Sequence, residues 1–346
     1  MSLLRPVLLP DEYVWGYLGR IMRFNGDSDV KHALGRIQRW GTSHQLVAGD
    51  ASSIELLARV ADVTTMHLVR HHTLVSYRRA FVRRVDQTAL LHGAPATREV
   101  MRITGHRSLR AACYFCPTCA CEDLSFHGSS YWRRSHQLPG AAVCVKHQCG
   151  LHYTYVDGAA FRSPMDLEGH SFAPDEQWSA SVSAHPEIHK FLELASYLAL
   201  SNAPYDEQTV SRLVRQRALA RGWSVGPVGS SRGAIEEALL SRFDATWLEE
   251  VVEDLYADWN DRKKETSLER ALYGGRERVS PGVYLLLLCV FYETAEMAMA
   301  ALHAAHEQPT REDDALSSAT SASRSSKSRR PVGRARASAE VGSVGV

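Results

Sequence analysis

The stretch CYFCPTCACEDLSFHGSSYWRRSHQLPGAAVCVKHQCGLHY, residues 113–153, holds six of the seven cysteines of the chain. Within it, Cys116-Pro-Thr-Cys119 and Cys144-Val-Lys-His147 are two pairs of candidate metal ligands, each with a two-residue spacer. Such a spacer lets both ligands of a pair point at one ion, and four nitrogen and sulfur ligands complete the tetrahedral shell of Zn²⁺. Because this shell leaves no position for water, the pattern predicts a structural zinc site and not a catalytic one.

The choice of ligands within this window stays open at the sequence level. Free thiols in a reduced protein would give the same letters, and further residues could replace a ligand or begin an incomplete second site. These residues are Cys113, Cys121, Cys149 and His152. For each of them, a small buried side chain or an exposed thiol is the simpler interpretation.

Upstream, residues 53–70 read SIELLARVADVTTMHLVR, with apolar residues spaced as on two short helices. Asp62-Val63 would form the turn between them, since Asp tolerates the left-handed conformation, and Thr64 or Thr65 would cap the second helix. This spacing predicts a helix-turn-helix over about residues 53–72, in which the second helix enters the major groove of DNA. The exposed positions facing bases would be Thr65, Met66, His67 and Arg70. The alternative is a helical hairpin that packs only within its own domain.

A run of arginines follows the predicted second helix. Between Val63 and Val85 there are five arginines and no acid, interleaved with aromatic residues: Arg70, Arg78, Arg79, Arg83 and Arg84. Clustered arginines neutralise phosphates and release counterions, so this segment is a candidate DNA-backbone contact. Four more arginines continue the basic character up to the first cysteine pair, at positions 98, 102, 107 and 110.

The zinc window also resembles the zinc-finger core of the TniQ family, which includes the TnsD target selectors of transposons. The pattern C-P-x-C, E-D, Y-x-R and L-P-G-x-x-x-C-x-x-H-x-x-x-L is matched at Cys116, Pro117, Cys119, Glu122, Asp123, Tyr131, Arg133, Leu138, Pro139, Gly140, Cys144, His147 and Leu151. The segment Leu9–Tyr13, reading LPDEY, resembles the opening of a TniQ domain. Two departures are His136, where the family usually has Trp, and the lack of another C-P-x-C downstream.

By this resemblance, the protein selects or tethers a transposition target on double-stranded DNA and recruits an AAA+ transposition ATPase, without itself breaking or joining strands. Some members act beside an RNA-guided CRISPR effector complex, in which base pairing reads the sequence. A homodimer is a further candidate assembly. Sequence alone leaves open whether this chain reads DNA directly.

The second half of the chain is expected to be helical. Apolar residues recur at helical spacing over 187–306, and TnsD-like members have a similar helical half, with matches here at Gly222-Trp223 and Pro281–Leu288. Between Glu236 and Asp261 there are nine acids and one arginine, which is either an ordinary solvated face or a surface for a basic partner. Residues 307–346 are rich in Ser, Ala, Arg and Gly, so we expect a disordered basic tail.

We therefore expect a mainly α protein: an N-terminal helix-turn-helix with a small zinc-finger module, an all-helical C-terminal domain and a disordered tail. The expected boundaries are a TniQ-like domain over 1–155 (zinc finger about 113–152), a linker over 156–186, a helical domain over 187–306 and the tail over 307–346.

Composition bounds the function. With 40 Lys+Arg against 39 Asp+Glu, the 346-residue chain cannot bind nucleic acid by bulk charge, so any contact must be local. No 18-residue apolar run or secretory signal is visible, which predicts no membrane partner and a cytoplasmic location. No P-loop, H-E-x-x-H or G-x-S-x-G motif occurs. Besides the target selector, we consider a zinc-stabilised helix-turn-helix transcription regulator and, with least support, a metal-dependent enzyme.

Overall fold

The computed structural model describes residues 2–46, 51–82, 112–201, 204–223, 232–251, 266–273 and 279–307. Met1–Ala305 form one compact unit, and the other unit, His306–Val346, lies almost entirely outside the described residues, as does the expected tail. The prediction of a mainly α protein is confirmed.

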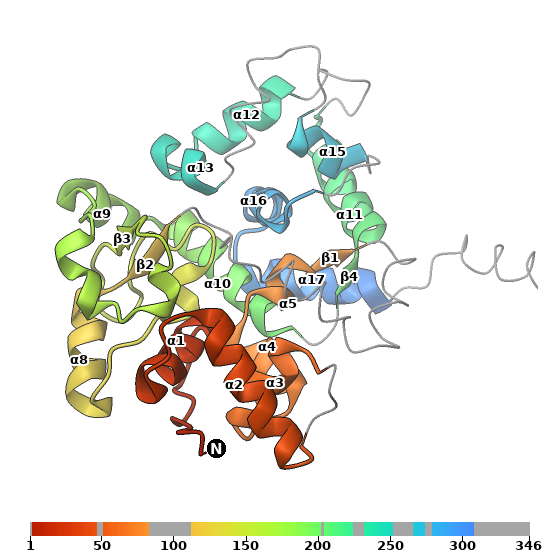
Figure 1. Cartoon of the computed structure of the whole chain (residues 1–346). Helices are drawn as coiled ribbons and strands as arrows, with labels where there is room; N and C mark the ends of the chain where they lie inside the picture. Colours follow the sequence, from red (N-terminus) through yellow and green to blue (C-terminus); the bar gives the residue numbers. More distant parts are fainter. Residues whose placement is uncertain are drawn as a thin grey trace, which may run out of the picture. The chain divides into compact units, whose positions relative to one another are not determined.

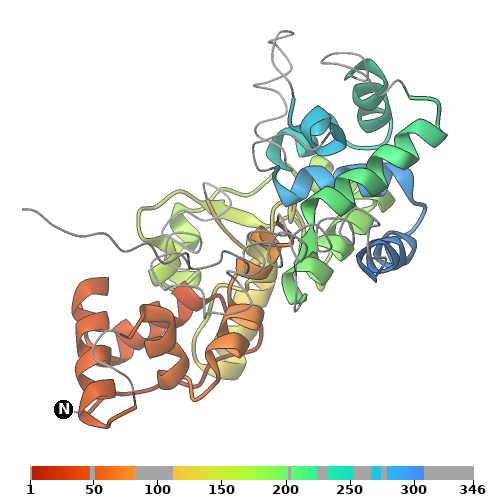
Figure 2. The same cartoon turned by 90° about the vertical axis from the view of Figure 1, so that its right-hand side faces the viewer.

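The N-terminal region consists of helices, the first four of which lie together at one end of this unit in both views (Figure 1, Figure 2). They are α1 (Val14–Asn25), α2 (Val30–Ser43), α3 (Ser53–Val60), α4 (Thr65–His72) and α5 (Val75–Arg78). Local chemistry sets their ends: Asp29 caps α2, and a capping box of Ser52 and Glu55 begins α3. The Glu12 carboxylate, fully buried, holds Arg20 of α1 in an ion pair at 2.7 Å.

The zinc window folds as a small module of one antiparallel strand pair and one helix. Its elements are β2 (Cys113–Phe115), α8 (Pro117–His127), the 3-10 turn η1 (Ser135–Gln137) and β3 (His152–Thr154). Cys113 pairs with Thr154 and Phe115 with His152, so the two ends of the window are held together by the sheet. Pro117 fills the first position of α8, where the missing N–H costs nothing, and Gly128 ends the helix in the left-handed conformation.

Residues 156–186, expected to be a linker, contain three short helices: η2 (Ala159–Phe161), η3 (Met165–His170) and α9 (Glu176–Ser183). Leu167 and Val182 are fully buried, so this segment contributes to the core. At Gly19 of α1, an added Cβ would lie 2.1 Å from the Phe161 carbonyl oxygen, which shows how closely η2 packs on α1. The segment escapes sequence reasoning because its apolar residues are too few for a helical period.

The C-terminal half is built around the buried helix α16 (Pro281–Phe291), which α10 (Pro186–Leu200), α11 (Glu207–Ala220), α12 (Arg232–Leu240) and α15 (Ser267–Tyr273) surround. The remaining elements are β1 (Phe81–Val82), β4 (Tyr205–Asp206), α13 (Ala245–Val251) and α17 (Ala295–Glu307). Helix α10 also packs on α4 and α5, and β1 pairs in parallel with β4. The two halves of the chain therefore share one core, while the predicted division at 155 and 187 stays a prediction.

Two further expectations concern membrane-spanning helices and the acidic stretch of the C-terminal half. Within the described ranges no single helix is long and apolar enough to cross a membrane; α16 and α17 meet that criterion only as a pair, bent by 113°. The acidic stretch Glu236–Asp261 is described only up to residue 251, where Glu237 and Glu249 are exposed.

Candidate metal centre and nucleic-acid interface

The first ligand pair lies at the start of α8. Cys116 is the N-cap residue, and its sulfur accepts a hydrogen bond from the Cys119 amide at 3.4 Å. Three positions later along the chain, the Cys119 side chain lies in the first turn of the helix, next to the Cys116 sulfur. Both side chains are buried, at 0 % and 3 % exposure. The cap therefore orients both thiols toward the same point.

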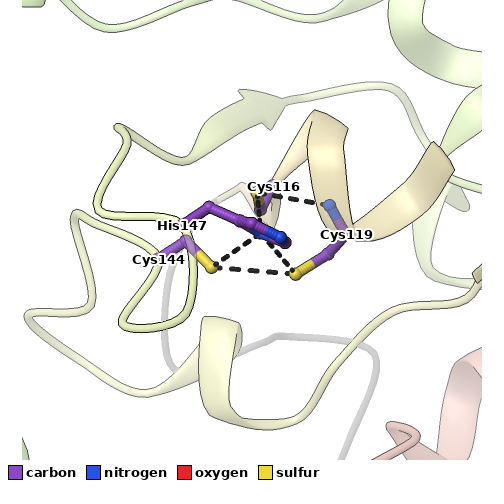
Figure 3. A group of neighbouring side chains, drawn as sticks. All are labelled: Cys116, Cys119, Cys144 and His147. Atoms are coloured by element: carbon purple, nitrogen blue, oxygen red, sulfur yellow. Dashed lines mark hydrogen bonds between the residues drawn. The ribbon is translucent and has the colours of Figure 1, made fainter. Parts of the chain in front are cut away.

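The second pair lies in a tight turn that faces α8. The Cys144 amide donates to the Cys149 carbonyl at 2.8 Å, and the Gln148 amide donates back to the Cys144 carbonyl at 2.8 Å. Gln148 takes a left-handed conformation with φ of 53°, which reverses the chain. This turn brings His147 back over Cys144, so both ligands point across to the first pair (Figure 3).

The four predicted ligands lie within 4.8 Å of one another: Cys116, Cys119, Cys144 and His147. The His147 Nδ1 atom is 3.4, 3.3 and 3.7 Å from the sulfurs of Cys116, Cys119 and Cys144, and the last two sulfurs are 3.7 Å apart. Tetrahedral Zn²⁺ with Zn–S bonds of about 2.3 Å and Zn–N bonds of about 2.0 Å has S···N edges of about 3.5 Å and S···S edges of about 3.8 Å. These four of the six distances between donor atoms thus already match a zinc coordination shell.

The histidine ligand is held from outside by a carboxylate. His147 Nε2 lies 3.1 Å from Glu122 Oε1, and Lys146 forms an ion pair with the other oxygen of Glu122. A second hydrogen bond of this kind fixes the tautomer of a ligating histidine, because the proton sits on the nitrogen that faces the carboxylate. It leaves Nδ1 unprotonated and directed at the three sulfurs. Sequence reasoning noted Glu122 but not as a partner of His147, although its position three residues after Cys119 on a helix was a usable signal.

The alternative ligands take different places. Cys121 is exposed, and burial raises the pKa of Cys113 to about 11, which keeps that side chain a neutral thiol. His152 packs its ring against Phe115. Cys149 is closest to the cluster, with its sulfur 3.5 Å from that of Cys116. Burial and the neighbouring Cys116 raise the pKa of Cys149 to about 12, so Cys149 stays a neutral thiol beside Cys116.

The predicted helix-turn-helix is present in the backbone. Helices α3 and α4 pack together, Asp62 in the turn has φ of 57°, and the Thr64 hydroxyl caps α4 by accepting from the His67 amide at 3.1 Å. Leu57 and Leu68 are fully buried between the helices. At the start of α4, Met66 is 63 % exposed and His67 is exposed, while Thr65 is half-buried. The amino-terminal end of α4 thus presents side chains outward, as the major-groove helix of this motif does.

The predicted arginine patch is only partly brought together. The Nε atom of Arg70 donates to the Leu200 carbonyl at 2.6 Å, at the carboxyl end of α10. Arg78 and Arg79 are half-buried, and burial lowers the pKa of Arg78. Arg83, Arg84 and the four arginines between positions 98 and 110 lie outside the described residues. A basic residue that sequence reasoning passed over is Arg59, exposed in the last turn of α3, directly before the turn to α4.

A family model matches the part of the chain that holds these residues. Residues 3–151 match the family model TniQ, so the match spans α1, the helix-turn-helix and all four members of the Cys/His cluster. This part of the chain is a TniQ domain. No curated protein matches the chain.

The TniQ assignment sets the general class of activity. The family's role is transposition-related target selection through DNA binding, and its members are non-enzymatic adaptor and DNA-binding proteins. The resemblance drawn from the zinc window is thereby confirmed. Within the TniQ domain, the Cys/His cluster is compatible with a structural zinc site.

Proposed function

We propose that this protein is a target-selection adaptor of transposition that reads double-stranded DNA through α4 and recruits an AAA+ transposition ATPase to the selected site. The observation that carries the proposal is the exposed start of α4, inside the TniQ domain. Met66 and His67 supply an apolar contact and a hydrogen-bonding contact of the kind that base edges accept in the major groove. Thr65 completes the proposed base-facing set, and Arg70 would join it by giving up its hydrogen bond to the Leu200 carbonyl.

Phosphate contacts would come from arginines that flank this helix. We assign this role to Arg78, Arg79, Arg83 and Arg84, and add Arg59 because of its exposure and its place before the turn. Each cation that neutralises a phosphate releases a counterion, so binding should weaken as salt increases. No bulk charge contributes, because the net charge of the chain is +1.

The Cys/His cluster would hold one Zn²⁺ through Cys116, Cys119, Cys144 and His147. The ion would serve a structural purpose, since all four positions of its shell would be protein ligands. Residues of this chain connect the zinc module to the segment that leads into α1. The Asp11 carboxylate accepts hydrogen bonds from Arg134 at 3.1 Å and from the Ser135 amide at 3.0 Å. The module would thereby fix the first helix of the TniQ domain.

Direct reading of DNA is the version we favour over guidance by a CRISPR effector complex, because the start of α4 is exposed. The exposed carboxylates of Glu237 and Glu249 support placing the ATPase contact on the helical half, since acids on helices repel phosphate and attract a basic partner.

The test is a selection of DNA sequences by the full chain, followed by affinity measurements on the winning sequence. Replacing Met66 and His67 together by Ala should weaken binding to that sequence by about tenfold or more, because each base contact contributes about 1–3 kcal/mol. Binding to random DNA should change much less. The matched control replaces Leu124 and Phe126, two exposed residues of α8, by Ala. Equal affinities of both double variants for the selected sequence would contradict reading through α4.

A further inference from the structure

A pocket of about 520 Å³ opens on the zinc module, lined in part by residues close in sequence to the metal ligands, such as Tyr114 and Ala142, and by none from the helix-turn-helix. Its walls come from the β2–β3 strand pair, from the start of α9 and from the start of α13. Its lining includes Tyr114, Tyr153, Tyr155, Asp175, Trp178 and Thr246. Its size lies within the range of about 300–1,000 Å³ that is usual for ligand pockets.

One side of the pocket is a surface of aromatic rings. Tyr114 and Tyr153 are opposite each other on β2 and β3, with ring centroids 5.7 Å apart. Tyr155 meets Tyr153 edge-on at 5.7 Å and is 61 % exposed. Tyr114 and Tyr153 belong to a regular strand pair that sets their positions, and Tyr155 follows directly after β3.

The other side is formed by one acid and one indole in fixed orientations. Asp175 caps α9, accepting from the Trp178 amide through Oδ1 at 2.8 Å. The Trp178 indole N–H donates to Asp244 Oδ1 at 3.2 Å, and Asp244 in turn caps α13. The cap uses one oxygen of Asp175, and a carboxylate can accept further hydrogen bonds through its second oxygen.

The charge of the lining selects the ligand. Among the described residues that line the pocket, Asp175 is the charged one, and none is Lys or Arg. An acid beside several aromatic faces attracts a cation, because ring faces carry partial negative charge. A nucleic-acid strand, by contrast, needs basic residues along its phosphates. A guanidinium suits both walls, since it stacks on rings and pairs with a carboxylate through two parallel hydrogen bonds.

We propose that this pocket binds an arginine side chain in a peptide segment of a partner protein. The guanidinium lies against the tyrosine and indole faces, and its N–H groups donate to Asp175. This inference goes beyond the proposed function, because it concerns protein recognition on the zinc module and does not depend on DNA reading by α4.

The test begins with panning of a random dodecapeptide library on the full-length protein. The selected peptides should be enriched in arginine. A synthetic form of the best peptide should bind the wild-type protein about tenfold more tightly than its Arg→Gln form, because one cationic contact to rings and carboxylate is lost. The same loss, about tenfold, is expected for the protein variant Asp175→Asn with Tyr155→Ala. Asn keeps the cap of α9 while removing the charge.

Two control changes separate the pocket from a general effect of charge or exposure. Glu176→Gln removes the next exposed carboxylate of α9, and Phe126→Ala removes an aromatic ring that is 85 % exposed on α8. Neither residue lines the pocket, so both variants should bind the peptide as the wild type does. Thermal unfolding and zinc content of all variants should match the wild type.

Several results would overturn the proposal. They are a library without enrichment, selected peptides that lack arginine, and peptide binding that is the same in the double variant and the wild type. Tighter binding of an Arg→Lys peptide would contradict guanidinium recognition. A dT12 oligonucleotide that loses binding in Tyr155→Ala but gains it in Asp175→Asn would show that the rings stack on bases, and the pocket would then be a single-strand site.

Discussion

At the scale of single residues, geometry distinguishes the four candidate metal ligands from their neighbour Cys149. Cys149 has its sulfur 3.5 Å from that of Cys116, as near as some members of the ligand set are to one another, and its carbonyl closes the turn that holds Cys144 and His147. Its sulfur contacts Cys116, which already belongs to the cluster. We therefore expect Cys149 to support the site without binding the ion.

Removing a ligand and removing its neighbour should have different effects. In Cys119→Ser, zinc content should fall well below one ion per chain and the free energy of unfolding should drop by several kcal/mol, because zinc-site binding energy of about 10 kcal/mol is largely folding energy. In Cys149→Ser, one ion per chain should remain. Elemental analysis of both purified variants checks this, and zinc loss in Cys149→Ser alone would reverse the assignment.

A second prediction concerns His72, the last residue of α4. Its ring is buried, and Nδ1 lies 2.8 Å from the Glu12 carbonyl oxygen, to which the neutral ring donates. Burial lowers the pKa of His72 in the folded protein. The unfolded chain, with a histidine pKa of about 6.5, therefore binds more protons in acid, and this contribution to stability is complete above pH 6.5 and is lost as the pH falls through the folded pKa.

The measurement is urea unfolding of the wild type and of His72→Gln at pH 7 and pH 5.5. The wild type should lose more stability than the variant on acidification, because Gln does not titrate and its amide can still donate to the Glu12 carbonyl. An identical loss in both proteins would show that other groups govern the acid sensitivity.

At the scale of elements, the helix-turn-helix shows how local patterns specify structure. Ser52, Glu55 and Thr64 cap α3 and α4, and Asp62 makes the turn with a positive φ. All of these signals are local and were readable from sequence. The environment of the arginines could not be read from the sequence, because it depends on α10. This helix follows α4 by more than 100 residues, and the carbonyl at its end accepts the hydrogen bond of Arg70. The same limit explains the aromatic pocket, whose walls come from three separate segments.

Arg59 and Arg78 should therefore behave differently when each is replaced by Ala. Replacing the exposed Arg59 should weaken binding to all DNA sequences and reduce the slope of log affinity against log salt by about one. Half-buried Arg78 should affect stability in addition, because its side chain packs against the protein. Affinity titrations at several salt concentrations, with thermal unfolding alongside, check both. An unchanged slope in Arg59→Ala would remove Arg59 from the backbone contacts.

At the scale of the whole molecule, the TniQ domain and the helical half depend on each other. Trp247 of α13 is fully buried, and its indole N–H donates to the Gly140 carbonyl of the zinc window at 2.9 Å. Arg134 donates to the Ala199 carbonyl at 3.3 Å, and α10 covers part of α4 and α5. A fragment that ends before α10 would expose these surfaces, so tests of function belong on the full chain.

Replacing Trp247 by Phe should lower the free energy of unfolding by about 2 kcal/mol or more, since the Gly140 carbonyl loses its donor and a cavity remains. The matched control is Trp223→Phe, at a half-buried tryptophan that packs on Phe291. The Trp223→Phe variant should lose clearly less free energy of unfolding. Comparable losses in urea unfolding would mean that the contact between α13 and the zinc window contributes little.

Loading of the partner ATPase onto DNA shows whether this protein selects a target through α4. DNA carrying the selected sequence is incubated with ATP and the AAA+ ATPase of the same element. Three reactions are compared: one with the full wild-type chain, one without the chain, and one with the Met66→Ala, His67→Ala double variant. The ATPase footprints on the DNA are then mapped. A target-selection adaptor that reads DNA through α4 predicts ATPase bound beside the selected sequence only with the wild-type chain. ATPase assembly at the same position and to the same extent without the chain, or with the double variant, would contradict it.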